Sequence, residues 1–187
     1  MPMFAIHRAE ADSVKHSLRP VLVDDAEFLF QLFVERNTER FSQLGWTDMQ
    51  LASMLQMQYR ARVAGYAQRF VDLEKFVICT ADQQRIGEVL MHRTAQEIRI
   101  VDICISNAYR KQGIATQLLS DLQREAAAKE ITITLSVDHG NPARRLYERL
   151  GFQETGKDPL QAEMGWRIAE VDTSQIDGAE TQGNLNA

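Results

Sequence analysis

A short polar segment from Tyr109 to Ala115 is the part of the chain best suited to chemistry, because it joins basic side chains to a glycine. The amides at the start of a helix have no partner within the helix, and the helix macrodipole favours negative charge there. Gly113 has no Cβ, so an anion can approach the backbone closely, and Arg110 adds a permanent positive charge. The segment therefore predicts a phosphate-binding turn at the start of a helix.

The elements on either side of this turn are those that such a site requires. Residues 98–105 are β-branched and mostly apolar, which predicts a strand buried on both faces. After the turn, apolar residues recur every four positions, which predicts one face of an amphipathic helix that ends near Lys129. These apolar residues are Ile114, Leu118, Leu122 and Ala126.

Two segments of this region resemble motifs of one enzyme family. Arg110-x-x-Gly113-x-Ala115 resembles the Arg/Gln-x-x-Gly-x-Gly/Ala motif with which the GCN5-related N-acetyltransferases bind the pyrophosphate of acetyl-coenzyme A. Residues 141–152 resemble the family pattern Asn-x-x-Ala-x-x-x-Tyr-x-x-x-Gly-Phe, although the asparagine lies one residue closer to the alanine than in that pattern. Both motifs occur in the expected order along the chain.

The resemblance implies a role for individual residues. In the family, the asparagine and the start of its helix contact the pantetheine arm, and the tyrosine is the general acid for the departing thiolate. Asn141 and Tyr147 are the matching residues here. The full set implied to bind the coenzyme is Ile103, Cys104, Ile105, Arg110, Lys111, Gln112, Gly113, Ile114, Ala115, Asn141 and Arg144. Without the resemblance, Asn-Pro is a routine helix start and Tyr147 is a packing residue.

Acyl transfer to an amine also needs the amine in its neutral form. For a lysine-like amine this costs roughly 4–5 kcal/mol at pH 7, so a general base is important. Two carboxylates are candidates: Asp102 interrupts an apolar strand, and Glu88 lies on the adjacent predicted strand. A buried carboxylate is costly unless it is paired, so the alternative is a structural ion pair with Arg99 or Arg93.

The rest of the chain predicts a mixed α/β fold that matches the family in the order of its elements over residues 18–168. We expect a mostly antiparallel, splayed sheet of six or seven strands flanked by about four helices. The strands are expected at 18–23, 75–80, 85–93, 98–106, 131–138, 152–156 and 162–168. One helix is expected to begin at Asp24 or Asp25, a second to run from the capping box Thr47-x-x-Gln50 to near Gly65, and a short one to be capped by Asn141. The methionine stripe of the second helix is expected to be core rather than a binding face.

Composition predicts a single globular domain of ordinary character. The chain has 187 residues, of which 44% are hydrophobic and 25% charged. We expect an arm at residues 1–17, the domain at 18–168, and an acidic, disordered tail at 169–187. No stretch resembles a signal peptide, a membrane span, a basic nucleic-acid surface or a metal-ligand set, so we expect a cytoplasmic protein without a metal, a membrane or a nucleic-acid partner.

The function implied by the resemblance is transfer of an acetyl group from acetyl-coenzyme A to a primary amine, by direct attack in a ternary complex. The acceptor is a small molecule or a peptide amine. The resemblance implies that residues 36–70 and 157–162 shape the pocket that binds it. Two alternatives stay open: a non-catalytic acyl-coenzyme A-binding regulatory module, and an interaction protein that docks through its Met/Gln-rich helix. The length of the acyl group and the oligomeric state, with a homodimer among the options, are also left open.

Overall fold

The computed structural model describes residues 15–41 and 45–168, and in that part of the chain seven strands form one sheet in the order β1-β2-β3-β4-β5-β7-β6. All neighbouring strands in it are antiparallel except β4 and β5, which are parallel. The strands are β1 (His16–Pro20), β2 (Glu74–Thr80), β3 (Arg85–Arg93), β4 (Glu97–Ile105), β5 (Thr132–Asp138), β6 (Gln153–Lys157) and β7 (Gln161–Trp166). The predicted mixed fold with a mostly antiparallel sheet is confirmed.

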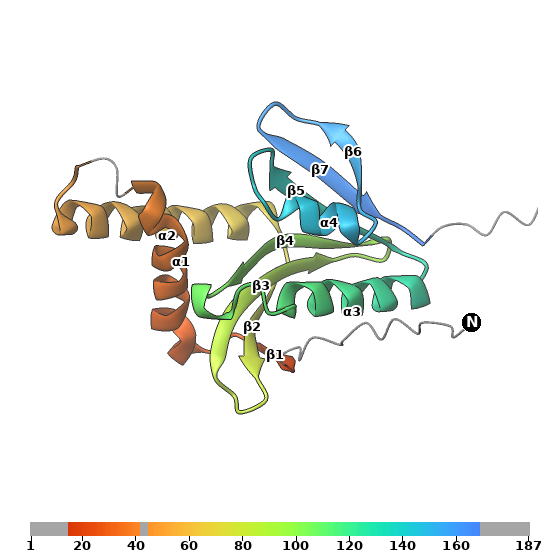
Figure 1. Ribbon diagram of the computed structural model, residues 1–187, viewed down its shortest axis with the longest axis horizontal. Helices are drawn as coiled ribbons and strands as arrows, with labels where there is room; N and C mark the ends of the chain where they lie inside the picture. Colours follow the sequence, from red (N-terminus) through yellow and green to blue (C-terminus); the bar gives the residue numbers. More distant parts are fainter. Residues whose placement is uncertain (1–14, 42–44, 169–187) are drawn as a thin grey trace, which may run out of the picture.

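Helices cover both faces of the sheet. In Figure 1, α1 (Ala26–Phe41) and α2 (Asp48–Arg69) lie to the left, and α3 (Ile114–Ala128) and α4 (Arg144–Arg149) lie to the right. Short 3₁₀ turns, η1 (Val23–Asp25) and η3 (Asn107–Tyr109), precede α1 and α3. Residues 1–14 of the predicted arm and all of the predicted tail, 169–187, lie outside the described residues. The end of the predicted arm, residues 16 and 17, belongs to β1.

The main core lies between α3 and one face of the sheet. The predicted apolar face of α3 is buried there, with Ile114, Leu118, Leu122 and Ala126 each no more than 4% exposed. They pack with alternate residues of the strands, such as Ile133 of β5. In β2, Ile78 belongs to this core. Its neighbours Val77 and Cys79 point to the other face of the sheet and pack with Leu29 of α1. Alternation along the strands, shifted where the pairing is irregular, therefore divides the core into two layers.

Several predicted boundaries were wrong for identifiable reasons. The first strand covers His16–Pro20 rather than 18–23, because the chain turns into η1 after Val21. Helix α2 continues past Gly65 to Arg69, where Tyr66 and Phe70 pack against each other and the Phe70 amide donates to the Tyr66 carbonyl. A mid-helix glycine costs only about 1 kcal/mol relative to alanine, so these contacts outweigh it.

The expectation that the methionines of α2 are core is wrong for two of them. Leu55 is buried, but Met49 is 80% and Met57 is 63% exposed. The predicted capping box is confirmed, because the Thr47 hydroxyl accepts from the Gln50 amide while the Gln50 side chain accepts from the Thr47 amide. Helical spacing located the helix correctly, but it did not determine how much of its apolar side would be covered.

Strand β4 carries an irregularity that shapes the centre of the sheet. Its pairing with β3 shifts at one point, so that Leu90 faces Asp102 while Met91 faces Ile100, and Val101 is an extra residue. A bulge of this kind bends the strand that contains it. On the other side, the pairing of β4 with β5 stops at Ile100 and Leu135. The two central strands therefore part beyond Ile100, in the direction of the turn that contains Arg110.

Candidate active site

A groove lies where β4 and β5 part. It is a cavity of about 680 Å³, within the size range of small-molecule and cofactor sites. Residues 101–105 of β4 form one wall, residues 135–138 of β5 form the other, and Arg36 of α1 and Tyr147 of α4 also line it. Because β4 faces a groove, Val101, Asp102, Ile103 and Ile105 are only partly buried, and the prediction of a strand buried on both faces is wrong for this half.

Tyr147 is the aromatic residue that lines this groove. Its ring packs edge-to-face against Phe152 at a centroid distance of 5.8 Å, which fixes its orientation. Burial raises the pKa of the Tyr147 hydroxyl to about 12, and the negative charge of Asp102 adds to the effect. The phenol is therefore protonated at neutral pH and can donate a proton or a hydrogen bond within the groove.

The predicted phosphate-binding turn forms a smaller cavity at the start of α3. This cavity, of about 210 Å³, is lined by Arg110, Lys111, Gly113 and Ala115, together with Ile105, which also lines the groove. Gly113 has φ of +81° and precedes the first helical residue, so the turn favours a glycine there, and the missing Cβ also allows close approach to the backbone. The two cavities thus share the end of β4 and the side chain of Arg110.

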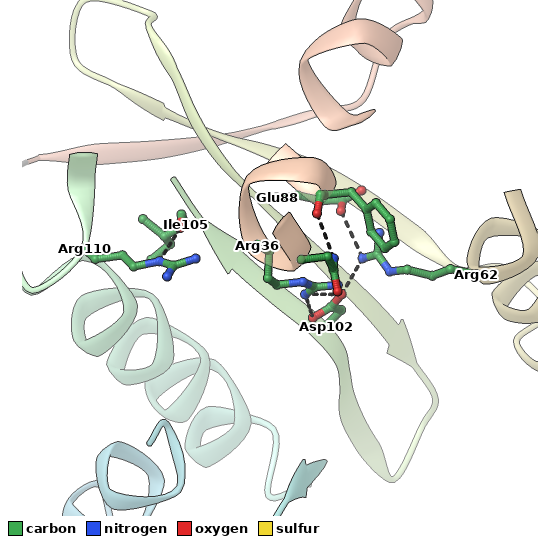
Figure 2. Close-up of polar contacts among 8 residues, drawn as sticks. Arg36, Arg62, Glu88, Asp102, Ile105 and Arg110 are labelled. Atoms are coloured by element: carbon green, nitrogen blue, oxygen red, sulfur yellow. Dashed lines mark hydrogen bonds and ion pairs between the residues drawn. The ribbon is translucent and has the colours of Figure 1, made fainter. Parts of the chain in front are cut away.

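Arg110 is oriented by the backbone. Its Nε donates to the Ile105 carbonyl at 2.9 Å, and Figure 2 shows the side chain lying beside the end of β4. Within residues 15–41 and 45–168, neither of its terminal nitrogens has a hydrogen-bond acceptor. A guanidinium held at one nitrogen and free at the other two is well placed to bind an anion.

The other predicted coenzyme residues are placed differently. The Gln112 side chain donates to the Ala108 carbonyl at 2.9 Å, which holds it against the backbone before the turn. The Ile114 side chain is 1% exposed and packs in the core, so it is not available to a ligand. The Asn141 carboxamide accepts from the Ala143 amide at 2.9 Å and lines the groove. It therefore caps a turn, and α4 itself begins at Arg144 rather than at Pro142. Arg144 pairs with Glu148 and Glu154 and lines neither cavity.

Four charged side chains from four elements, α1, α2, β3 and β4, meet beside the groove. Arg36 donates Nη1 to both oxygens of Asp102 at 3.0 Å. Arg62 of α2 donates Nη2 to Asp102 and, at 3.3 Å, to Glu88 of β3. Figure 2 shows the two arginines reaching the carboxylates from different helices. The alternative that the carboxylates form ion pairs with structural arginines agrees with the structure. The partners are Arg36 and Arg62 and not the named Arg99 or Arg93, because Arg99 pairs with Glu163 and Arg93 with Glu74 and Glu125.

Within this network the two carboxylates are compensated unequally. Asp102 receives hydrogen bonds from both arginines, whereas Glu88 has a single, longer contact with Arg62. Glu88 is 7% exposed, and this burial raises its pKa above that of an ordinary glutamate although Arg62 acts against the shift. The raised pKa brings proton exchange by Glu88 closer to neutral pH than in an exposed glutamate.

Sequence reasoning missed three residues of the site. Arg62 and Arg149, which lines the smaller cavity, were not singled out, and Glu35 was not considered. The Glu35 carboxylate accepts from the Asn107 amide at 2.7 Å and so attaches α1 to the segment before the turn. Glu35 and Arg36 follow the buried residues Leu32 and Phe33 on α1, but helical spacing alone gave no reason to assign them partners on β4 and η3.

Comparisons with known proteins identify the family to which this fold belongs. A family model described as an acetyltransferase (GNAT) domain matches residues 46–169, which is more than half of the chain. The chain therefore belongs to the GNAT acetyltransferase family. A search of curated proteins found no match.

Solved structures share the fold at low sequence identity. The PaiA N-acetyltransferase from Thermoplasma acidophilum, in complex with coenzyme A, is 18% identical with a TM-score of 0.61, covering 82% of this chain and 99% of that one. The spermidine N-acetyltransferase from Vibrio cholerae, in complex with coenzyme A and spermine, is 21% identical with a TM-score of 0.54, covering 81% and 95%. Among the described residues, no helix has the length and apolar character needed to cross a bilayer.

Proposed function

We propose that this protein is an N-acetyltransferase that transfers the acetyl group of acetyl-coenzyme A to a primary amine in a ternary complex. The observation that carries the proposal is the continuity of the two cavities, which share Ile105 and Arg110. An anion-binding turn thereby leads into a groove between strands that ends at a protonated tyrosine. A long ligand with a diphosphate at one end and a thioester at the other fits this arrangement.

Each part of the site has a task in this proposal. The free guanidinium nitrogens of Arg110, the side chain of Lys111 and the first amides of α3 bind the diphosphate. Residues 103–105 pair with β3 but not with β5. Their backbone groups that face β5, apart from the Ile105 carbonyl held by Arg110, form strand-like hydrogen bonds with the amides of the pantetheine arm, and Asn141 contacts the same arm. The coenzyme supplies a thioester carbonyl, and a backbone amide near Cys104 stabilises the charge that develops on the carbonyl oxygen.

The reaction then needs one base and one acid. The neutral amine attacks the thioester carbon, a C–N bond forms, and the C–S bond breaks. Glu88 accepts the proton that the nitrogen loses, and Tyr147 donates its proton to the departing sulfur. Asp102 was the other candidate base, but its pairs with two arginines suit it better to hold them in place.

The activity is tested by incubating the protein with acetyl-coenzyme A and a panel of primary amines and following the free thiol. We expect thiol release that depends on the amine, with N-acetylated product detected by mass spectrometry in equal amount. Tight binding of acetyl-coenzyme A in calorimetry without thiol release for any amine would support the regulatory-module alternative. Absence of coenzyme binding would overturn both.

A further inference from the structure

A third cavity lies on the opposite side of the charge network from the groove. It has a volume of about 280 Å³ and opens between η1 with the first turn of α1 and the C-terminal half of α2, above β2 and β3. Most of its lining is apolar or aromatic: Val21, Leu22, Leu29, Tyr59, Val63 and Leu90. A cavity of this size holds a ring and a short chain, but not a long polar ligand.

The polar residues of this cavity are few. Glu88 and Arg62 line it, and Lys75 is exposed beside them. Glu88 is the one acidic residue among the described residues that line the cavity. Its contact with Arg62 is the longest in the network, so a cationic nitrogen could replace Arg62 at Glu88 while Arg62 keeps its shorter bond to Asp102. The buried Nε of Arg62 has no hydrogen-bond partner within the described part of the chain, so this guanidinium is incompletely satisfied in its present position.

Glu88 also connects this cavity to the groove. It is directly opposite Cys104 in the register of β3 and β4, and residues opposite each other on neighbouring strands have Cβ atoms about 5 Å apart. Cys104 lines the groove in which the thioester is proposed to lie. An amine held at Glu88 is therefore one strand away from the backbone amides at Cys104.

We propose that this cavity is the acceptor pocket and that it selects a primary monoamine with an apolar body, such as an arylalkylamine. This inference rests on the function proposed above. The aliphatic residues and Tyr59 enclose the body, and Glu88 receives the ammonium group. The ammonium loses one proton to solvent, and the neutral amine attacks the thioester carbon in the groove that Cys104 lines. Glu88 takes the proton that the nitrogen loses as the C–N bond forms, and Tyr147 protonates the sulfur as the C–S bond breaks.

A polyamine is a poor fit to this pocket. Each additional ammonium group of a polyamine needs its own acceptor, yet the other charged residues lining the cavity, Arg62 and Lys75, are cationic. Two positive charges in a space of about 280 Å³ would repel each other and the largely buried Arg62 with little screening by water. The pocket therefore discriminates by charge number as well as by shape.

Filling the cavity tests the proposal. Val63 lines it and is 39% exposed, so Val63→Trp can place an indole in the space without disturbing the core. Val71 is 73% exposed and does not line the cavity, so Val71→Trp is the matched control. With 2-phenylethylamine as acceptor, we expect Val63→Trp to raise KM for the amine at least tenfold. KM for acetyl-coenzyme A should change less than twofold, and Val71→Trp should behave like the wild type.

Two further measurements separate this proposal from the proposed function. Spermidine should give a kcat/KM at least tenfold below that of 2-phenylethylamine. A higher kcat/KM for spermidine, or an unchanged KM for the amine in Val63→Trp, would overturn the pocket assignment. Either result would still leave the acetyltransferase activity established. If no amine releases thiol, calorimetry of 2-phenylethylamine with the coenzyme A-loaded protein still decides the question. Binding that Val63→Trp abolishes supports the pocket, and absence of binding to the wild type refutes it.

Discussion

One terminal nitrogen of Arg36 on α1 donates hydrogen bonds to both carboxylate oxygens of Asp102 on β4, at 3.0 Å each. The pair joins residues 66 positions apart in the chain and stands at the edge of the groove. Because Asp102 also pairs with Arg62, one carboxylate connects both helices of one face to the central strand of the sheet. The position of α1 and α2 over the site therefore depends on Asp102.

Breaking this pair should destabilise the fold measurably. Removing one partner leaves the charge of the other partly buried and incompletely paired. We therefore expect Arg36→Ala and Asp102→Asn each to lower the free energy of unfolding by about 1–3 kcal/mol. The double variant should lose less than the sum of the two, as measured by chemical denaturation in a double-mutant cycle. Strict additivity would mean that the two side chains do not interact in solution.

Reversing the charge at the turn should abolish coenzyme binding. Arg110→Glu places a carboxylate where we propose a diphosphate, so we expect at least a 100-fold rise in the Kd for acetyl-coenzyme A measured by calorimetry. Arg124→Glu makes the same charge change on an exposed part of α3 and should leave the Kd within about threefold. An unchanged Kd in Arg110→Glu would remove the turn from the coenzyme site.

The hydroxyl of Tyr147 should matter for turnover and not for binding. Tyr147→Phe keeps the ring against Phe152, and we expect kcat to fall by about 100-fold while the Kd for acetyl-coenzyme A changes little. Because burial raises the pKa of Tyr147 to about 12, the phenol stays protonated and wild-type kcat should not decline from pH 8 to pH 10. A loss of rate in that range at equal folded content would argue against Tyr147 as the acid.

Asp25 should control stability in acid. It is 1% exposed, accepts two hydrogen bonds from Arg19 at 2.7 and 2.8 Å and one from the Leu22 amide, and these hold the pKa of its carboxyl well below its usual range. Its contribution is therefore complete above the unfolded-state pKa near 4 and is lost as the pH falls through the lower folded-state pKa.

The measurement is the free energy of unfolding across pH. At pH 7 we expect Asp25→Asn to cost about 3 kcal/mol, with the difference from the wild type shrinking as the pH falls below about 4. Asp24→Asn, at the exposed neighbouring position, is the control and should change stability by less than about 0.5 kcal/mol. A difference that stays constant with pH would show that the Asp25 charge is not responsible.

Local patterns predicted the elements whose burial follows a simple period. The face of α3 and the bounds of β3 at 85–93 agree with the structure, because a helix on a sheet and a central strand bury residues at fixed spacing. The turn at Gly113 was also predictable, since its left-handed backbone favours glycine. The interruption of an apolar strand by Asp102 correctly indicated a residue with a special environment.

What could not be predicted depends on contacts between distant segments. Nothing in the sequence near Arg36 or Arg62 indicates that their partners lie on β3 and β4, because ion pairs leave no periodic signal. The exposure of Met49 and Met57 likewise depends on how far α2 extends past the elements it packs on. The roles proposed for Glu88, Asp102 and Tyr147 in catalysis remain predictions.

The parting of β4 from β5 also bears on how the protein behaves without its ligand. Beyond Ile100 and Leu135, two strands in the middle of the sheet present amides and carbonyls that no neighbouring strand satisfies. Such groups are a template on which an extended segment of another molecule can add itself, with self-association as the hazard. A pantetheine arm bound there would take the place of a neighbouring strand. Saturating coenzyme should therefore slow amide hydrogen exchange along residues 101–105 and reduce self-association of the purified protein.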